Sequence, residues 1–236
     1  MGRNRCLGIM LLLGTLLGGN VRGQALSLSG IKAGVGTVQN YNRGFYYFWD
    51  LTGFFSAEFN GNLRLDCAAA LGQRGEIWGL TAAAGLEYGL PFFRPFVPLY
   101  LRARYLYDGL PAWETDTQSL IPSAALEWKW FGLSLGYTLR WTLFAGEAAL
   151  FEPVLAYGVY GKLYAAEDSS ISLRVSNFGD FYADNLGSVH LVLDNRFQIT
   201  PGIQVKCDFD LVLSGNVKRI VSVYGVSFSE GIIFRW

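Results

Sequence analysis

Leu133-Ser-Leu-Gly-Tyr-Thr-Leu-Arg-Trp-Thr-Leu143 alternates strictly between apolar and polar residues. The odd-numbered positions of this stretch hold leucine, tyrosine and tryptophan, and the even-numbered positions hold serine, glycine, threonine and arginine. Successive side chains of a β-strand point to opposite faces, so a strand with this sequence has one face suited to hydrocarbon and one suited to water. The same alternation recurs over 78–90 and 203–213. It predicts strands that separate an apolar environment from a polar one.

Turn-forming residues divide the chain beyond residue 23 into about twelve such strands. The predicted strands are 25–38, 46–59, 62–72, 77–90, 96–107, 120–130, 133–145, 150–165, 170–178, 187–199, 202–213 and 220–236. Twelve strands over the remaining 213 residues (236 − 23) give about 18 residues each, which suits roughly 9–11 membrane residues plus a connection. Ten strands is the alternative if the weak segments 46–59 and 170–178 are misread, and eight would require long loops that we do not find.

The connections between these strands alternate in length. Tight connections follow the even-numbered strands, at Asn60-Gly61, Pro91–Pro95, Phe131-Gly132, Ala166–Ser169 and Thr200-Pro201. Those after the odd-numbered strands are mostly longer, and the longest runs from Asp108 to Ser119. Transmembrane barrels have short periplasmic turns and longer external loops. We therefore predict an all-β fold, a single transmembrane antiparallel up-and-down β-barrel of a bacterial outer membrane, with both ends in the periplasm.

The composition agrees with this fold class. The chain is 51% hydrophobic with a positive mean hydropathy, yet beyond residue 23 it lacks the ~18 consecutive apolar residues of a membrane helix. Charged residues make up 16%, against roughly 25% in soluble domains. Lys plus Arg equals Asp plus Glu at 19 each, so no net field recruits nucleic acid. A soluble β-sandwich is the alternative, but it requires neither the alternating connections nor the aromatic residues near the strand ends.

Residues 1–23 have the layout of a secretory signal peptide. Arg3 and Arg5 form a basic start, an apolar run extends over 7–19, and small residues precede the cleavage expected before Gln24. A lone membrane anchor fits less well, because the run is shorter than the ~20 residues that span a bilayer. A lipoprotein signal also fits less well, because Cys6 precedes the apolar run. We expect a signal peptide over 1–23 and the barrel over 24–236, exported to the outer membrane.

The charged residues of the predicted strands concentrate on the face opposite the apolar one, which must be the lumen. The predicted lumen-lining charged residues are Lys32, Glu58, Arg64, Asp66, Glu87, Arg102, Arg104, Glu127, Lys129, Arg140, Glu152, Lys162, Arg174, Asp194, Arg196, Lys206, Asp208 and Asp210. Folding the hairpin at Gly61 places Glu58 opposite Arg64 as a predicted ion pair. Arg102 and Arg104 share one face of a strand, so the basic residues form either a track for anionic solutes or one half of mutually neutralising ladders.

Aromatic residues on the apolar face gather near strand ends, as in the girdles of membrane barrels. The predicted membrane-interface aromatics are Tyr88, Tyr105, Tyr107, Trp128, Trp130, Trp141, Tyr157 and Trp236. Further aromatics occur in the predicted loop 39–50, and Trp113 lies in the loop 108–119. Exposed loop aromatics can anchor a binding partner, although those beside a strand end more often belong to the girdle.

The C-terminal residues Ile232, Phe234 and Trp236 are apolar at alternate positions. This end resembles the C-terminal strand that outer-membrane barrels present to their assembly machinery, although the usual terminal residue is Phe. The resemblance implies the barrel-assembly machinery as a partner. Glu230 falls on the lipid face by strict alternation, and a bulge within Ser229–Gly231 would turn it inward.

The sequence offers little for catalysis or cofactor binding. The single histidine, His190, falls on the lumen face, whereas outer-membrane phospholipases use a Ser–His pair on the lipid-facing wall. No histidine-rich, Cys-x-x-Cys or phosphate-binding motif is present, so we expect no enzyme, no metal site and no cofactor. Cys67 and Cys207 lie four strands apart around the closed barrel, about 19 Å, against the ~7 Å that a disulfide allows. We predict two free thiols.

These observations favour a narrow porin-like channel for small hydrophilic solutes. Small inward residues such as Gly85, Ser134 and Gly136 leave space in the lumen, and no long segment is available as a plug. In size and layout, though without a matching motif, the mature chain resembles the twelve-stranded porins that pass acidic oligosaccharides. The alternative is a non-conducting surface-exposed barrel whose external loops bind a host or cell-surface partner. Outer-membrane lipid is the expected surrounding, and nucleic acid is not an expected partner.

Overall fold

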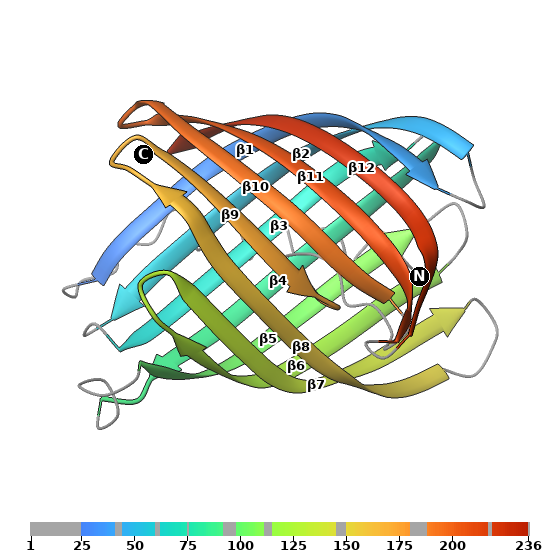
Figure 1. The fold of residues 1–236 in the computed structure, drawn as a ribbon, viewed down its shortest axis with the longest axis horizontal. Coiled ribbons are helices and arrows are strands. Elements are labelled where there is room, and N and C mark those ends of the chain that lie inside the picture. Colours follow the sequence, from blue (N-terminus) through green and yellow to red (C-terminus); the bar gives the residue numbers. More distant parts are fainter. Residues whose placement is uncertain are drawn as a thin grey trace, which may run out of the picture.

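The computed structural model describes residues 25–40, 44–59, 62–74, 76–91, 98–110, 115–144, 150–179, 188–216 and 219–235. Within them the chain forms twelve strands that close into a barrel (Figure 1). The strands are β1 Ala25–Asn40, β2 Gly44–Phe59, β3 Leu63–Arg74, β4 Ile77–Gly89, β5 Leu99–Leu110, β6 Thr115–Glu127, β7 Phe131–Phe144, β8 Leu150–Ala165, β9 Ser169–Ser176, β10 Ser188–Thr200, β11 Ile203–Asn216 and β12 Arg219–Arg235. The predicted signal peptide and Trp236 lie outside the described residues.

Each strand pairs antiparallel with its neighbours in sequence, and β1 closes the barrel against β12 from Gly30↔Arg235 to Asn40↔Gly225. This confirms the predicted up-and-down barrel of twelve strands. The two weak segments are real strands, β2 and β9, so counts of ten and eight are wrong. The predicted bounds of β8 match the structure, whereas β6 begins at Thr115 rather than at 120.

The barrel has two distinct ends (Figure 1). We call the end that holds the connections 60–62, 90–98, 128–130, 166–168 and 201–202 the turn end, and the opposite end the loop end. The predicted long loop Asp108–Ser119 is wrong, because β5 and β6 continue their ladder to Leu110↔Thr115. The longest connections are 177–187 at the loop end and 90–98 at the turn end, so the predicted difference in length is weaker than the sequence indicated.

The alternation of the sequence becomes the outer and inner faces of the wall. On β7, Leu135 and Tyr137 point outward with 59% and 57% of their surfaces exposed, whereas Thr138 is 1% exposed. Inside, a small apolar cluster forms from Leu106 and Ile121 with Ala156. A β-barrel surrounded by hydrocarbon requires an apolar outer face and only a small core. No helix of the described residues is long and apolar enough to cross a membrane.

Aromatic rings cover glycines on neighbouring strands of the inner face. Gly30 of β1 pairs with Phe54 of β2, and a Cβ at Gly30 would lie 2.6 Å from the Phe54 ring and 2.0 Å from the Phe234 carbonyl oxygen. Gly132 of β7 pairs with Tyr160 of β8, whose ring would lie 2.2 Å from a Cβ. Gly30 therefore requires glycine, because the backbone oxygen cannot move away, whereas a side chain at position 132 would displace the Tyr160 ring. Each ring packs over the glycine and fills the space that a side chain would occupy.

The bulge predicted within Ser229–Gly231 is absent. β12 keeps an unbroken register there, with Glu230 opposite Val35 on β1 and opposite Cys207 on β11. Phe228 and Ile232 point outward on either side of it, at 42% and 44% exposed. A bulge between them would turn one of these two side chains into the lumen. Glu230 therefore stays exposed on the outer face.

Candidate functional site

The inner wall carries the charged residues in clusters that join neighbouring strands. Near the turn end, Arg102 on β5 lies between carboxylates on both adjacent strands. Its Nε donates to Oε2 of Glu87 on β4, and its Nη2 donates to Oε1 of Glu127 on β6. The three side chains are 21–29% exposed. Arg102 is thus held by two charge-assisted hydrogen bonds, which are stronger than neutral ones.

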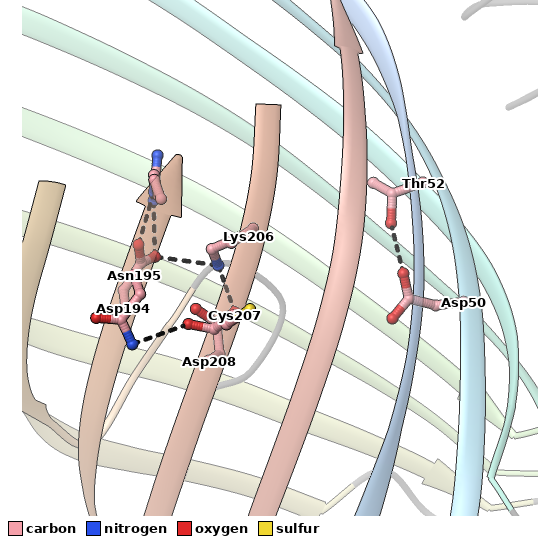
Figure 2. Close-up of polar contacts among 8 residues, drawn as sticks. Asp50, Thr52, Asp194, Asn195, Lys206, Cys207 and Asp208 are labelled. Atoms are coloured by element: carbon pink, nitrogen blue, oxygen red, sulfur yellow. Dashed lines mark hydrogen bonds and ion pairs between the residues drawn. The ribbon is translucent and has the colours of Figure 1, made fainter. Parts of the chain in front are cut away.

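A second cluster joins β10 and β11, and Figure 2 shows its members Asp194, Lys206 and Asp208 side by side. Lys206 Nζ lies 3.1 Å from Oδ2 of Asp194 and 2.5 Å from Oδ2 of Asp208. Arg196 Nε donates to Oδ1 of Asp194 at 2.7 Å. Two cations and two carboxylates therefore alternate along this wall. Local pairing of this kind neutralises most of the charge that the strands carry inward.

Two smaller pairs occur elsewhere on the wall. Arg140 and Glu152 face each other across β7 and β8, with Nη2 2.5 Å from Oε2. Arg64 Nε bonds Oδ1 of Asp66 at 3.0 Å, and the Ser56 hydroxyl donates to the same oxygen at 2.6 Å.

The predicted Glu58–Arg64 ion pair needs correction. The two residues do face each other in the register, but the carboxylate at bonding distance from Arg64 is Asp66. Arg64 finds this acid two residues along the same face of its own strand. Glu58 lies next to the connection 60–62 and is exposed, so water solvates it.

His190 belongs to the inner wall of β10 and is largely buried. Its Nδ1 lies 2.8 Å from Oδ2 of Asp210 on β11. Ser176 on β9 is its direct cross-strand neighbour. The Ser176 hydroxyl, however, donates to the carbonyl oxygen of Phe178 at 2.7 Å. A serine whose proton is held by a carbonyl is not activated by a base, so this arrangement holds the chain in place rather than preparing a nucleophile.

The remaining predicted lumen residues are dispersed. Lys32 and Arg104 line one inner cavity, and Arg174 lines another. Lys162 lies exposed at the irregularity of the β8–β9 ladder. Lys129 needs correction, because β6 ends at Glu127 and strand alternation no longer applies. It lies in the turn 128–130, with its Nζ 5.5 Å from the centre of the Trp130 ring.

The predicted interface aromatics that the structure describes lie outward or at strand ends. Tyr88 and Tyr105 are 42% and 40% exposed on the outer face. The Tyr105 hydroxyl donates to Gln118 at 3.0 Å and that of Tyr107 to Asp116 at 2.9 Å. The Trp128 ring stacks on the Phe131 ring, and the Trp141 ring lies against the Phe151 ring. Trp130 lies exposed in the turn 128–130, and Tyr157 is half-buried on β8. Their role as a girdle stays a prediction.

The chain turns inward after β9, which the alternation of apolar and polar residues does not predict. Asn177 follows the last residue of β9 and bonds the backbone of β8. Its Nδ2 donates to the Leu155 carbonyl oxygen at 2.7 Å, and its Oδ1 accepts from the Tyr157 amide at 2.9 Å. Phe178 then packs against the cluster of Leu106, Ile121 and Ala156. We call Asn177–Gly179 the inward segment. The inward segment has three described residues, so the expectation that no long segment forms a plug stays a prediction.

The inward segment is also held by β5, which lies four strands from β9 around the barrel. Arg104 Nη1 on β5 donates to the carbonyl oxygen of Gly179 at 3.0 Å. A phenylalanine placed just after a strand is the one sequence signal that could have revealed the segment, since a solvated loop seldom needs an apolar residue there. The segment narrows the lumen on the side of β5–β8.

Two cavities lie along the inner wall. The larger, of about 330 Å³, is bordered by five cationic side chains and one carboxylate, Lys32, Arg64, Arg104, Arg196, Lys206 and Asp66. The smaller, of about 160 Å³, lies beneath the inward segment against Arg102, Arg104 and Arg174. Arg104 borders both. No group of three potential metal ligands occurs among the described residues.

The architecture is similar to several solved barrels. The NanC porin superposes with a TM-score of 0.55 at 10% identity, covering 86% of this chain and 98% of that one. The KdgM porin in complex with disordered oligogalacturonate gives 0.53 at 9% identity, with coverages of 89% and 98%. Outer-membrane phospholipase A from Escherichia coli gives 0.52 at 10% identity, with coverages of 87% and 92%.

The shared property of these proteins is the barrel, because two are porins and one is an enzyme. The sequence matches no model of a known protein family, and no curated protein matches it. Function must therefore be argued from the inner wall.

Proposed function

We propose that the protein is an outer-membrane channel that passes small hydrophilic solutes through a narrow lumen. The observation that carries the proposal is the solvent exposure of charged groups inside the barrel: Arg64 and Asp66 are 52% and 40% exposed although they bond each other. Side chains just fill a barrel of eight strands, and sixteen or more leave an open channel. Twelve strands with partly exposed ionised walls fit a water-containing passage narrower than that of a general porin.

The outer face supports the membrane location. Large apolar side chains cover it on all sides, and a soluble protein rarely exposes so extensive an apolar surface. We assign the turn end to the periplasm, since short turns lie there in barrels of this class. The surrounding lipid is one partner. The second proposed partner is the assembly machinery, which would recognise β12. An export signal over 1–23 is also part of the proposal.

The proposal includes no catalytic activity. Phospholipase A shares the barrel fold, but here the only histidine faces inward and pairs with Asp210. Its cross-strand serine is held by the inward segment.

Swelling of proteoliposomes tests the proposal. Vesicles containing the refolded barrel should swell in isotonic solutions of a small sugar such as arabinose and more slowly in a trisaccharide such as raffinose. Vesicles prepared without protein give the baseline. A barrel that is folded by circular dichroism but leaves swelling at the baseline for every solute would refute the channel and favour the binding function.

A further inference from the structure

The prediction of a loop over 39–50 concealed an inward carboxylate, because Asp50 lies within β2 and on its inner face. Its side chain bends over Gly34 of β1, where a Cβ would lie 3.3 Å from both carboxylate oxygens. The Thr52 hydroxyl donates to Oδ1 at the long distance of 3.4 Å, and Figure 2 shows this pair apart from the cluster on β10 and β11. Asp50 is half-buried, so its carboxylate is accessible from the lumen.

Asp50 differs from the other inward carboxylates in having no cation bonded to it. Six of the others bond a lysine or an arginine, namely Asp66, Glu87, Glu127, Glu152, Asp194 and Asp208. Within the described part of the chain, no lysine, arginine or histidine bonds Asp50. Lys32 faces Thr52 in the register, but its Cε lies toward β12, 3.2 Å from where a Cβ at Gly231 would be. The charge of Asp50 is therefore not neutralised by direct pairing.

Asp50 faces the inward segment across the lumen. β2 and β8 are six strands apart in the closed barrel of twelve, so they lie on opposite sides of it, and the inward segment bonds β8 through Asn177. Asp50 is nine residues from the turn end of β2 (59 − 50), and Phe178 is nine residues beyond the turn end of β9 (178 − 169). Because strands rise by a similar distance per residue, Asp50 and Phe178 stand at similar heights in the barrel.

The wall on both sides of Asp50 is formed by glycines. Gly34 and Gly72 are its direct cross-strand neighbours. Gly231 faces Gly34 from β12, and Gly79 faces Gly72 from β4. Glycine adds no side chain to the lumen, so this wall stays open where the inward segment narrows the opposite side. A solute that passes the inward segment therefore moves along this wall and meets the carboxylate.

The cationic side chains that border the larger cavity do not reverse this charge. Arg64 bonds Asp66, and Lys206 bonds both Asp194 and Asp208. The other three cations at that cavity also have interactions of their own. The fields of two opposite charges in contact largely cancel at a distance. A carboxylate without a bonded cation, between low-dielectric walls, keeps its field.

We propose that Asp50 makes the narrowed passage selective for cations, from K⁺ to small solutes that carry one ammonium group. The proposal rests on the channel function and adds the class of solute to it. Charged side chains at a constriction set the ion preference of a channel, and carboxylates favour cations. A cation that passes the inward segment exchanges part of its water for the oxygens of Asp50, whereas an anion is repelled there.

The test is the reversal potential of the full-length refolded barrel in planar bilayers across a KCl gradient. We expect the wild type to prefer K⁺ over Cl⁻ by at least about threefold, and Asp50→Asn, which keeps an oxygen for Thr52, to lose at least about half of that preference. Asp50→Glu should retain it. The matched control is Glu152→Gln, which removes the same charge near the loop end of β8, where Glu152 bonds Arg140; its preference should change by less than about a quarter.

The outcomes separate the selectivity from the channel function. Conductance with a preference for Cl⁻ in the wild type, or equal shifts in Asp50→Asn and Glu152→Gln, would overturn the role of Asp50 and leave the channel intact. Bilayers without conductance steps would overturn the channel and the selectivity with it. If Asp50→Asn does not refold, Asp50→Ser takes its place, and the sign of the wild-type potential still decides. With ethanolamine hydrochloride in place of KCl the sign should stay the same, and a reversed sign would refute the extension to ammonium solutes.

Discussion

Removal of Arg102 should destabilise the barrel because it leaves two carboxylates without their shared cation. Glu87 and Glu127 both bond this guanidinium, and each is less than a third exposed. Breaking a buried ion pair by deleting one partner costs about 3–5 kcal/mol. Water in the lumen reduces that cost, so we expect Arg102→Met to lower the free energy of unfolding by about 2–3 kcal/mol.

The matched variant neutralises the two acids as well. Arg102→Met combined with Glu87→Gln and Glu127→Gln carries no unpaired charge, and it should regain more than half of the lost stability. The assay is guanidinium-induced unfolding from lipid vesicles, followed by tryptophan fluorescence in both directions. If the triple variant is no more stable than the single one, the loss comes from packing of the arginine stem and the charge argument is wrong.

Three further predictions concern other parts of the barrel. Phe178→Ala should raise single-channel conductance, because it removes a ring that narrows the lumen. Phe209→Ala on the outer face is the control and should leave conductance unchanged. Equal conductance in wild type and Phe178→Ala would contradict the inward segment. Glu230→Leu should raise the free energy of unfolding by on the order of 1 kcal/mol, since a carboxylate facing lipid is costly; a loss of stability would show that Glu230 has a partner on that surface. Cys67 and Cys207 are free, so intact mass without reductant should show both thiols and maleimide should label both after unfolding; a bridge between them would refute the strand order.

The faces and number of strands could be predicted because a membrane barrel repeats one physical constraint along its whole length. Each strand must present apolar side chains outward and polar ones inward, so the alternation in Leu133–Leu143 fixes the orientation of β7 without any knowledge of its neighbours. The same regularity placed Cys67 and Cys207 on strands too distant to bridge. Turn-forming residues on both sides also delimit the weak strand at 170–178, which the structure has as Ser169–Ser176.

The other features of the barrel depend on individual contacts, which leave no periodic pattern in the sequence. The choice of Asp66 over Glu58 as the partner of Arg64 is decided by side-chain reach and by Ser56, which alternation does not describe. The continuation of β5 and β6 to Leu110↔Thr115 depends on pairing beyond the apolar band. The inward segment is invisible to strand patterns because Asn177 and Phe178 are placed by tertiary contacts with β5–β8.

Single-channel recording of the refolded barrel in planar lipid bilayers tests the central claim most directly. A water-containing lumen with partly exposed ionised walls predicts discrete conductance steps in KCl, smaller than those of sixteen-stranded porins. Bilayers that stay silent while the same preparation is folded by circular dichroism and by resistance to unfolding in gel electrophoresis would contradict it.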